Sequence, residues 1–447
     1  MKLISIQQAI TQVGQWANLP DSHELIRSGI YRNPEYNQQP FYKIELEWNK
    51  RGEADLDKDG LANRHTIRAE LDAQTGRMLA FYRHDYRPEH IRVENEMEES
   101  RYEVLYPRVL EWIGRLELGI KPQELKLVRK TVIGETLFRM SFQRQYQGIP
   151  IRDYQALEIK LNTNYELIHL NCTWDECAFE ERTGLIPESE LRQSFGNEQL
   201  ILAYISYLAS AHPFYMFRED TYNAHTGQLV YSDQPELLEI IDLSTTMPQR
   251  NEQISVLHQP IFDADYDSLK LENGVSEADP YAPHPFFTMV TEEDILKSKD
   301  IAVSYLKTHH NTESCQFAFI QNYGQNVVKS MHGNQIVVEI HRVVNDISVI
   351  GAGIRLVIDH HTWKVKNVMD ALKFTMAVNE LELDGLQKAL VSRSTAWEHM
   401  KEKINLQLQY LFEPDVTDTA GKKAILTYVL KSEWICDACT GEMQLID

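Results

Sequence analysis

The sequence predicts an α+β protein in which helices pack on antiparallel sheets and the whole arrangement is internally duplicated. A five-residue pattern, Asp/Asn-Ala-x-Thr-Gly, occurs three times, at residues 72–76, 223–227 and 437–441. Helical and strand-like stretches also follow one another in the same order in the two halves of the chain. Helices alternating with runs of antiparallel strands are typical of the α+β class. Repetition on this scale indicates architecture rather than catalysis.

Each copy of the pattern predicts a β-hairpin turn. Apolar residues alternate with polar ones on both sides of the first copy, at Ile67, Ala69, Leu71, Met78, Ala80 and Tyr82. Asp or Asn at the first position can accept hydrogen bonds from backbone N–H groups further round the turn, and the final Gly supplies a positive φ. The three copies therefore predict equivalent hairpins.

A longer block occurs twice and strengthens the prediction of a duplicated body. Residues 144–164 and 342–362 are both predicted to form strand, tight turn, strand, tight turn and strand, and the two blocks align if a shift of one residue is allowed. Each block is followed further along the chain by a copy of the hairpin pattern.

The first half predicts three helices separated by strands. An amphipathic helix carries Ile6, Val13 and Trp16 on one face and stops near Pro20. After a strand-rich segment at 41–86, a second helix is expected over 94–116, and Pro107 should kink or divide it. Strands follow over 131–174. The periodicity then predicts a third helix over 188–209, before the hairpin at 223.

The second half begins after a proline-rich stretch. Periodicity dissolves from 243 to 285, which indicates a linker or a long ordered excursion. Thr291 and Asp294 then form a plausible capping box that opens a helix. Strands at 337–368, a long helix over 384–411 and a terminal hairpin complete this half. The predicted domains are an N-terminal unit at 1–90, a first repeat at 91–242, the linker at 243–288 and a second repeat at 289–447.

Composition limits the partners. The 447 residues are 43% hydrophobic, enough for two or more domains. The net charge of −21 disfavours phosphate backbones and anionic lipid surfaces, so no nucleic-acid partner is expected. No apolar run approaches the roughly 20 residues of a membrane span, and the first residues turn polar too soon for a signal peptide. Five cysteines, an odd number, favour a reducing compartment. A cytoplasmic protein is expected.

The hairpin sequences carry a family resemblance. Residues 221–230 and 435–443 resemble the C-terminal hairpin of the PepSY domain, and their combination with the block at 147–151 is similar to the YcdB/YcdC-type repeat proteins of Gram-positive bacteria. The similarity covers most of the chain outside the proline-rich stretch. It implies tandem PepSY-like units in a bacterial protein. PepSY units are similar to modules in metallopeptidase propeptides, which inhibit the enzyme or assist its folding. The pattern has no catalytic residues to carry over. Unlike in the exported members of this family, no signal peptide or lipobox is expected from the first residues of this sequence.

An acidic loop is the sharpest metal candidate. Asp55, Asp57 and Asp59, followed by Gly60, match the opening of a calcium loop. The twelfth position of such a loop needs a bidentate Glu, but Thr66 stands there. The missing carboxylate favours a solvated hairpin loop over a calcium site.

Cysteine and histidine pairs are weaker candidates. Cys436 and Cys439 have the Cys-x-x-Cys spacing of zinc and redox sites, but a structural zinc site usually needs a second such pair, and the spacing of Cys172 and Cys177 does not supply one. Incidental cysteines are therefore favoured. Neighbouring histidines at 309–310 and 360–361 would point to opposite faces of a strand, which disfavours a shared metal.

Searches for catalytic motifs find no His-Glu-x-x-His, nucleophile elbow or phosphate loop. No catalytic residue and no cofactor are therefore predicted, although a triad assembled from distant residues would be invisible in one sequence. We expect a non-enzymatic binding or regulatory protein that engages a protein or peptide partner, for example a peptidase, through a sheet face or edge. The alternatives are a hydrolase with a dispersed active site and a calcium-dependent interaction protein.

Overall fold

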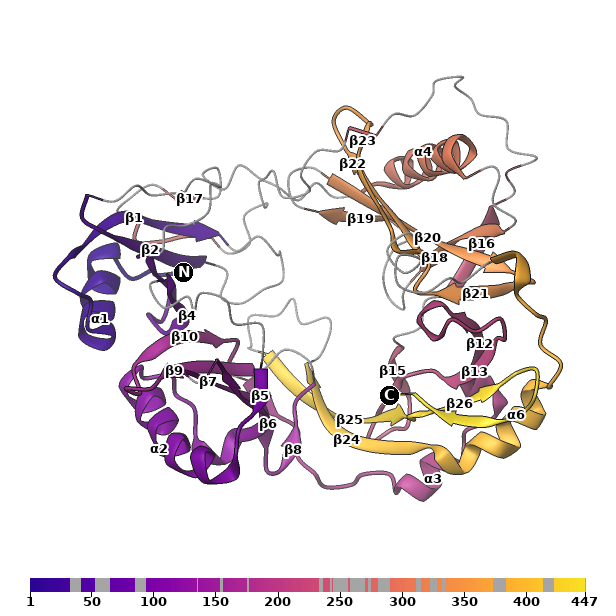
Figure 1. The fold of residues 1–447 in the computed structure, drawn as a ribbon, viewed down its shortest axis with the longest axis horizontal. Helices are drawn as coiled ribbons and strands as arrows, with labels where there is room; N and C mark the ends of the chain where they lie inside the picture. Colours follow the sequence, from indigo (N-terminus) through magenta and orange to yellow (C-terminus); the bar gives the residue numbers. More distant parts are fainter. Residues whose placement is uncertain are drawn as a thin grey trace. The chain divides into compact units, whose positions relative to one another are not determined.

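A computed structural model describes most of the chain, and the following account concerns residues 1–32, 42–52, 65–84, 94–134, 136–152, 156–174, 177–232, 236–241, 243, 256–257, 270–271, 275–279, 290–310, 315–321, 328–331, 335–372, 383–412 and 422–446. These residues form mainly antiparallel strands with a few helices, so the predicted α+β class is confirmed (Figure 1). They divide into two compact units. Unit 1 is Met1–Glu180, Asp265–Pro283 and Gln409–Ile425, and unit 2 is Glu181–Ala264, His284–Leu408 and Leu426–Asp447.

Unit 1 contains one eleven-stranded sheet with the order β17-β1-β2-β3-β4-β10-β9-β7-β6-β5, in which β8 pairs with β7 off this path. Its strands are β1 (His23–Arg32), β2 (Tyr42–Lys50), β3 (Ile67–Asp72), β4 (Met78–Arg83), β5 (Glu94–Glu96), β6 (Leu125–Ile133), β7 (Leu137–Tyr146), β8 (Ile149–Pro150), β9 (Ala156–Asn162), β10 (Leu167–Cys172) and β17 (Lys270–Leu271). Strand β17 lies inside the segment predicted as a linker and pairs antiparallel with β1.

Two helices contribute to the core of unit 1. Helix α1 (Ile6–Ala17) begins at a capping box formed by Ser5 and Gln8, and its apolar face is buried against the sheet, so the first predicted helix is confirmed. Helix α2 (Glu99–Arg115) runs through Pro107 without a break, so the expected division is wrong. Pro107 is exposed, which leaves the buried face of α2 continuous. A short 3₁₀ turn, η2 (Pro122–Glu124), precedes β6.

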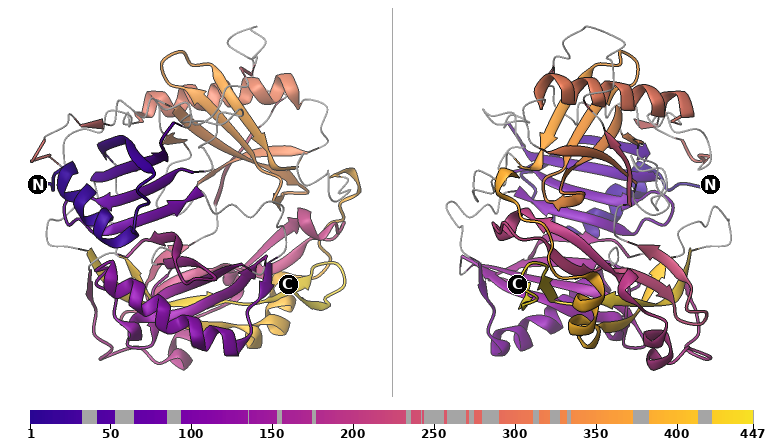
Figure 2. Two further views of the ribbon diagram at one scale, coloured as in Figure 1. Left: turned by 60° about the vertical axis from the view of Figure 1, so that its left-hand side comes forward. Right: turned by 90° about the vertical axis from the view of Figure 1, so that its right-hand side faces the viewer.

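Unit 2 contains a second eleven-stranded sheet with the order β16-β18-β20-β21-β12-β13-β26-β27, to which β19, β22 and β23 add off this path. Its strands are β12 (Leu200–Ile205), β13 (Phe214–Phe217), β16 (Glu236–Ile241), β18 (Gln316–Gln321), β19 (Val328–Met331), β20 (Gln335–Val344), β21 (Ile347–Ile350), β22 (Ile354–Asp359), β23 (Val365–Asp370), β26 (Trp434–Asp437) and β27 (Met443–Leu445). Helix α4 (Glu292–His309) lies across these strands (Figure 1, Figure 2). Its capping box at Thr291 and Asp294 is confirmed.

A smaller sheet has the order β11-β25-β14-β15, and β24 also pairs with β25. Its strands are β11 (Cys177–Phe179), β14 (Asp220–Asn223), β15 (Leu229–Ser232), β24 (Asn405–Phe412) and β25 (Lys422–Lys431). The division into units falls within β24 and β25. In unit 1, β11 runs parallel to the first residues of β25, and in unit 2, β14 runs antiparallel to its later residues.

The strands around β13 and β25 are paired in a crossed manner. Strand β13 pairs with β26, and β14 pairs with β25. Two residues, 218–219, separate β13 from β14, and two residues, 432–433, separate β25 from β26. Neither connection, Arg218-Glu219 or Ser432-Glu433, contains the Gly or Asn that a two-residue hairpin prefers. Each chain segment therefore continues from one sheet into another. We call this arrangement the crossed pairing.

Two helix predictions are wrong, and each fails at a strand that pairs with a member of the crossed pairing, β12 with β13 and β24 with β25. The segment 188–209 forms the short helix α3 (Glu188–Gln193), the 3₁₀ turn η3 (Asn197–Gln199), strand β12 and the turn η4 (Ser206–Leu208). The segment 384–411 forms α6 (Arg393–Met400), the turn η7 (Lys401–Lys403) and β24. Strand pairing, of β12 with β13 and β21 and of β24 with β25, overrides a weak helical spacing in β-branched and aromatic sequence.

The predicted domain boundaries at 90, 242 and 288 stay a prediction. The two compact units draw their segments from both halves of the chain. Among the described helices, none is both long and apolar enough to cross a bilayer.

Candidate functional site

The three Asp/Asn-Ala-x-Thr-Gly segments all form hairpin turns, between β3 and β4, β14 and β15, and β26 and β27. In each, the Oδ1 atom of the first residue accepts a hydrogen bond from the N–H of the third, over 2.8 Å at Asp72, 2.9 Å at Asn223 and 2.7 Å at Asp437. The Gly closes the turn with φ of 78° at Gly76, 68° at Gly227 and 80° at Gly441. We call these the Asp72, Asn223 and Asp437 turns.

The alanine of each turn joins the hairpin to the start of a helix. Ala73, Ala224 and Ala438 are fully buried. The carbonyl of Ala73 accepts a hydrogen bond from Ile4, the residue before the cap of α1. The carbonyl of Ala224 accepts one from the N–H of Ile186, and that of Ala438 accepts one from the N–H of Val391. Ile186 directly precedes the N-cap residue of α3, and Val391 directly precedes the N-cap residue of α6. In each alanine the backbone N–H and C=O groups are both hydrogen-bonded and the methyl group is fully buried. The surrounding packing therefore leaves no room for a larger side chain at this position.

The Asp437 turn differs from the other two in what its side chains meet. At Asp72, the second carboxylate oxygen accepts a hydrogen bond from Thr75 Oγ1 at 2.7 Å. At Asp437, the second oxygen, Oδ2, accepts one from His212 Nδ1 at 2.7 Å. The variable third position of this turn is Cys439, and the potential metal-ligating atoms of His212, Asp437 and Cys439 all lie within 4.8 Å of one another.

The crossed pairing positions His212. Strand β13 pairs with β26 so that Phe214 lies opposite Asp437, and the N–H of Ala438 donates to the carbonyl of Pro213 over 2.8 Å. His212, the residue directly before Pro213, therefore lies over the Asp437 turn. Its backbone N–H donates to Ser210 Oγ at 3.1 Å. A contact between residues 225 positions apart thus depends on strands that only the complete fold brings together.

The electrostatics of this group favour a neutral thiol. Burial and the nearby Asp437 charge raise the pKa of Cys439, whose Sγ donates to the carbonyl of Lys388 at 3.4 Å. Burial acts to raise the pKa of Asp437, but the hydrogen bonds from His212, Thr440 and Cys439 outweigh it and hold the pKa below its usual value. A nucleophilic cysteine needs a lowered pKa in an electropositive setting. The pKa shift of Cys439 runs in the opposite direction.

The structure places the other sequence candidates outside this group. Cys436 is buried, and its Sγ lies 3.7 Å from the carbonyl of Asp437, so the Cys-x-x-Cys pair does not converge on one point. His360 Nε2 bonds Asp294 Oδ1 at 3.0 Å, beside the capping box of α4. His310 is buried, with its Nδ1 3.5 Å from Arg342. The calcium candidates Asp55, Asp57 and Asp59 lie outside the described residues.

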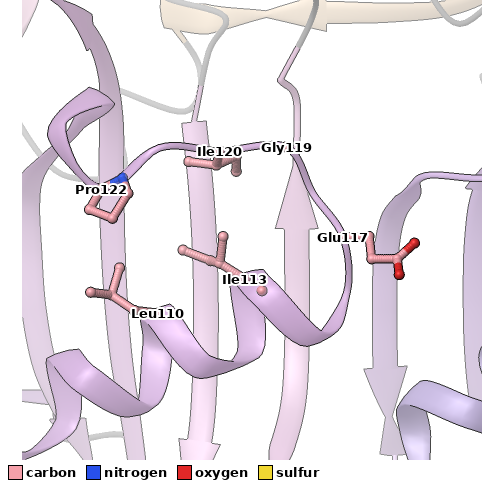
Figure 3. Close-up of a pocket in the computed structure, with 7 residues that line it drawn as sticks. Leu110, Ile113, Glu117, Gly119, Ile120 and Pro122 are labelled. Atoms are coloured by element: carbon pink, nitrogen blue, oxygen red, sulfur yellow. The ribbon is translucent and has the colours of Figure 1, made fainter.

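A hollow of about 470 Å³ lies in unit 1, between the end of α2 and the chain that follows it. Figure 3 shows Leu110 and Ile113 on the helix facing Ile120 on the loop and Pro122 at the start of η2, with Glu117 at the side. Glu117 is the only ionisable residue among those that line it. The hollow therefore offers apolar surface without the paired acid and base groups of a catalytic site.

Comparisons with known proteins give no relative. No family model matches the chain, and neither a curated protein nor a solved structure is significantly similar to it.

Proposed function

We propose that this protein is a non-enzymatic, cytoplasmic binding module that captures an extended segment of a protein or peptide partner by adding it as a strand to a sheet edge. The edge we propose is that of β15 in unit 2. Strand addition uses the unpaired N–H and C=O groups of an edge strand for affinity and the neighbouring side chains for specificity.

The observation that carries this proposal is the pairing of β4 with β10 in unit 1. Each is the last strand of a hairpin, and the two pair antiparallel at three positions, with Phe81 opposite Leu170. The Tyr82 and His169 rings meet edge to face, with centroids 4.8 Å apart. The chain therefore already contains one example of an extended strand added to the outer edge of such a hairpin.

The corresponding strand β15 lies at the end of its sheet in the part of the chain that the structure describes. Its residues, Leu-Val-Tyr-Ser at 229–232, carry no charge, and Leu229 is 37% exposed. The edge strand β5 of unit 1 contrasts with it, since Glu94 and Glu96 flank Asn95 and all three are exposed. Charged side chains protect a sheet edge against pairing. The uncharged edge of β15 lacks that protection and favours a partner strand.

We further infer that the helix-and-hairpin segments are copies of one PepSY-like unit. The shared hydrogen bonds of the Asp72, Asn223 and Asp437 turns support this reading, as does the link from each buried alanine to the start of a helix that precedes it in the chain. The resemblance adds peptidases as a candidate partner class. The calcium-dependent alternative rests on Asp55, Asp57 and Asp59 and stays a prediction.

The test compares two lysine substitutions at the edge with a matched control. Lysines on an edge strand oppose strand addition, so Leu229→Lys with Val230→Lys should lose the proteins that the wild-type chain captures from native lysate, as measured by mass spectrometry. Val104→Lys is the control, because Val104 is 57% exposed but lies on helix α2, which has no strand edge. Amide exchange should then show protection of residues 229–232 by the purified partner.

Two results would contradict the proposal. One is equal capture by the wild type and the double variant, which would place any binding surface elsewhere. The other is a purified chain that turns over a substrate, which would favour the dispersed hydrolase instead.

A further inference from the structure

We propose that His212, Asp437 and Cys439 form a Zn²⁺ site in unit 2, with a fourth coordination position open to water. The site does not depend on the proposed strand addition, because it is built from the Asp437 turn and the residue before β13.

The ligand set fits zinc. Imidazole nitrogen, cysteine sulfur and carboxylate oxygen are the three donor types that Zn²⁺ takes in proteins, whereas calcium and magnesium prefer oxygen alone. Bond lengths of about 2.0–2.3 Å in a tetrahedron place the donor atoms about 3.3–3.8 Å apart. The three atoms here lie within 4.8 Å of one another without an ion, so no separation has to shorten by more than about 1.5 Å to close around zinc. His212 Nδ1 and Asp437 Oδ2, now 2.7 Å apart, would move apart by about 0.6 Å if both atoms bound the ion.

The turn fixes two of the three ligands before any ion binds. Asp437 Oδ1 accepts hydrogen bonds from the N–H groups of Cys439 at 2.7 Å and Thr440 at 2.9 Å, which directs Oδ2 towards His212. The same bonds hold the backbone of Cys439. Partial exposure of the side chains, 29% for His212 and 15% for Asp437, gives an ion access from solvent.

Zinc binding would change the hydrogen bonding at two places. The Cys439 thiol would release its proton to solvent and bind as the thiolate, which ends its donation to the carbonyl of Lys388. The ion would also replace the direct hydrogen bond between His212 and Asp437. The bound ion would then tie β13 to the β26–β27 hairpin, segments that lie more than 200 residues apart in the chain.

The other two turns show that this group is not a by-product of the turn itself. The Asp72 turn has Gln74 at the variable position, and its second carboxylate oxygen is taken by Thr75. The Asn223 turn has His225 at that position, but an amide replaces the carboxylate. In the described residues, the Asp437 turn is the one of the three that brings a histidine, a carboxylate and a thiol together.

The experiment uses the full chain, stripped of metal with a chelator and titrated with Zn²⁺ and, as a spectroscopic probe, Co²⁺. We expect one equivalent of tightly bound ion and a thiolate-to-cobalt charge-transfer band. Cys439→Gln should abolish the band and weaken zinc binding at least tenfold, and His212→Gln should weaken binding at least tenfold while the band persists at high cobalt. Gln74 occupies the position of Cys439 in the Asp72 turn, so glutamine is compatible with this turn.

His225→Gln is the matched control, since it removes a histidine from the corresponding position of the Asn223 turn and should leave both signals unchanged. Circular dichroism of each variant confirms folding. The proposal is overturned if the wild-type chain binds no stoichiometric zinc at micromolar concentration. It is also overturned if Cys439→Gln and His212→Gln bind zinc like the wild type, because the ion would then lie elsewhere.

Discussion

The Asp72 and Asp437 turns have the same backbone but different chemistry. Both close on a glycine with φ near 80°, and both hold a fully buried alanine that meets the start of a helix. The carboxylate of Asp72 is satisfied within its own turn by Thr75, whereas that of Asp437 bonds His212, a residue 225 positions away. The local pattern therefore fixes the backbone of the turn, while distant strand pairing decides which side chains the turn meets.

The largest expected difference between the two turns is their response to zinc. An ion at 100 times its dissociation constant stabilises the state that binds it by about 2.7 kcal/mol. Hydrogen exchange should therefore slow in peptides from 434–446 when zinc is added, and it should not change in peptides from 67–83. Equal slowing in both hairpins would show a general effect of the ion and would remove the distinction.

Alanine in place of the closing glycine should destabilise both turns, and the Asp72 turn more. A left-handed backbone costs a residue with a Cβ about 1–2 kcal/mol. At Gly76 the new Cβ would also lie 2.9 Å from Gln12 Oε1 and 3.3 Å from Ile4 Cδ1, whereas at Gly441 the nearest atom is Val391 Cγ2 at 3.7 Å. We expect losses of about 2 kcal/mol for Gly76→Ala and about 1 kcal/mol for Gly441→Ala. Local amide exchange of each hairpin measures them, and a larger loss at Gly441 would contradict this reasoning.

In the metal-free chain, replacing the first aspartate of a turn by asparagine should destabilise the Asp437 turn more than the Asp72 turn. The Asn223 turn makes the same backbone hydrogen bonds with an amide oxygen, so Asp72→Asn should cost no more than about 0.5 kcal/mol. Asp437→Asn also removes a charged acceptor from His212, and we expect a loss of about 1 kcal/mol, reduced by the partial exposure of both side chains. Local exchange at 434–446 and 67–83 provides the measurement. Equal costs at both sites would mean that the His212 bond adds nothing.

The smallest expected effect is a pH dependence at the Asp437 turn. Hydrogen bonds to the carboxylate hold the pKa of Asp437 below its usual value against the opposing effect of burial. A lowered pKa stabilises the folded state above the ordinary value of about 3.9, and this contribution is lost as the pH falls through the folded pKa. The difference in the free energy of unfolding between the metal-free wild type and Asp437→Asn should therefore be constant near pH 6 and shrink below about pH 4. A stability difference that grows as the pH falls would contradict this prediction.

The sequence predicts those parts of the fold that are decided within a few residues. The three turns, the first helix, and the capping box at Thr291 with the helix that follows it depend on local hydrogen bonds, apolar spacing and glycine conformation. The helices expected over 188–209 and 384–411 fail because β12 pairs with β13 and β21, and β24 pairs with β25, and helical spacing does not encode these pairings.

The candidate site shows the same limit. Cys439 was visible as a member of a Cys-x-x-Cys pair, but its neighbour Cys436 is buried outside the group. His212 carries no sequence signal of its own, because its place over the turn depends on the pairing of β13 with β26. A thiol at the variable position of an otherwise repeated turn is the one local sign that could have drawn attention to the site.

The crossed pairing has a consequence for biosynthesis. Asn223 at the end of β14 lies opposite Thr427 of β25, so about 200 residues must be translated after β14 before its partner exists. At ribosomal speeds of about 5–20 residues per second, the nascent chain waits roughly 10–40 s with an incomplete apolar sheet. During that time β14 is open to the β25 of a neighbouring copy, and entangled dimers formed in this way would be the characteristic failure of rapid overexpression.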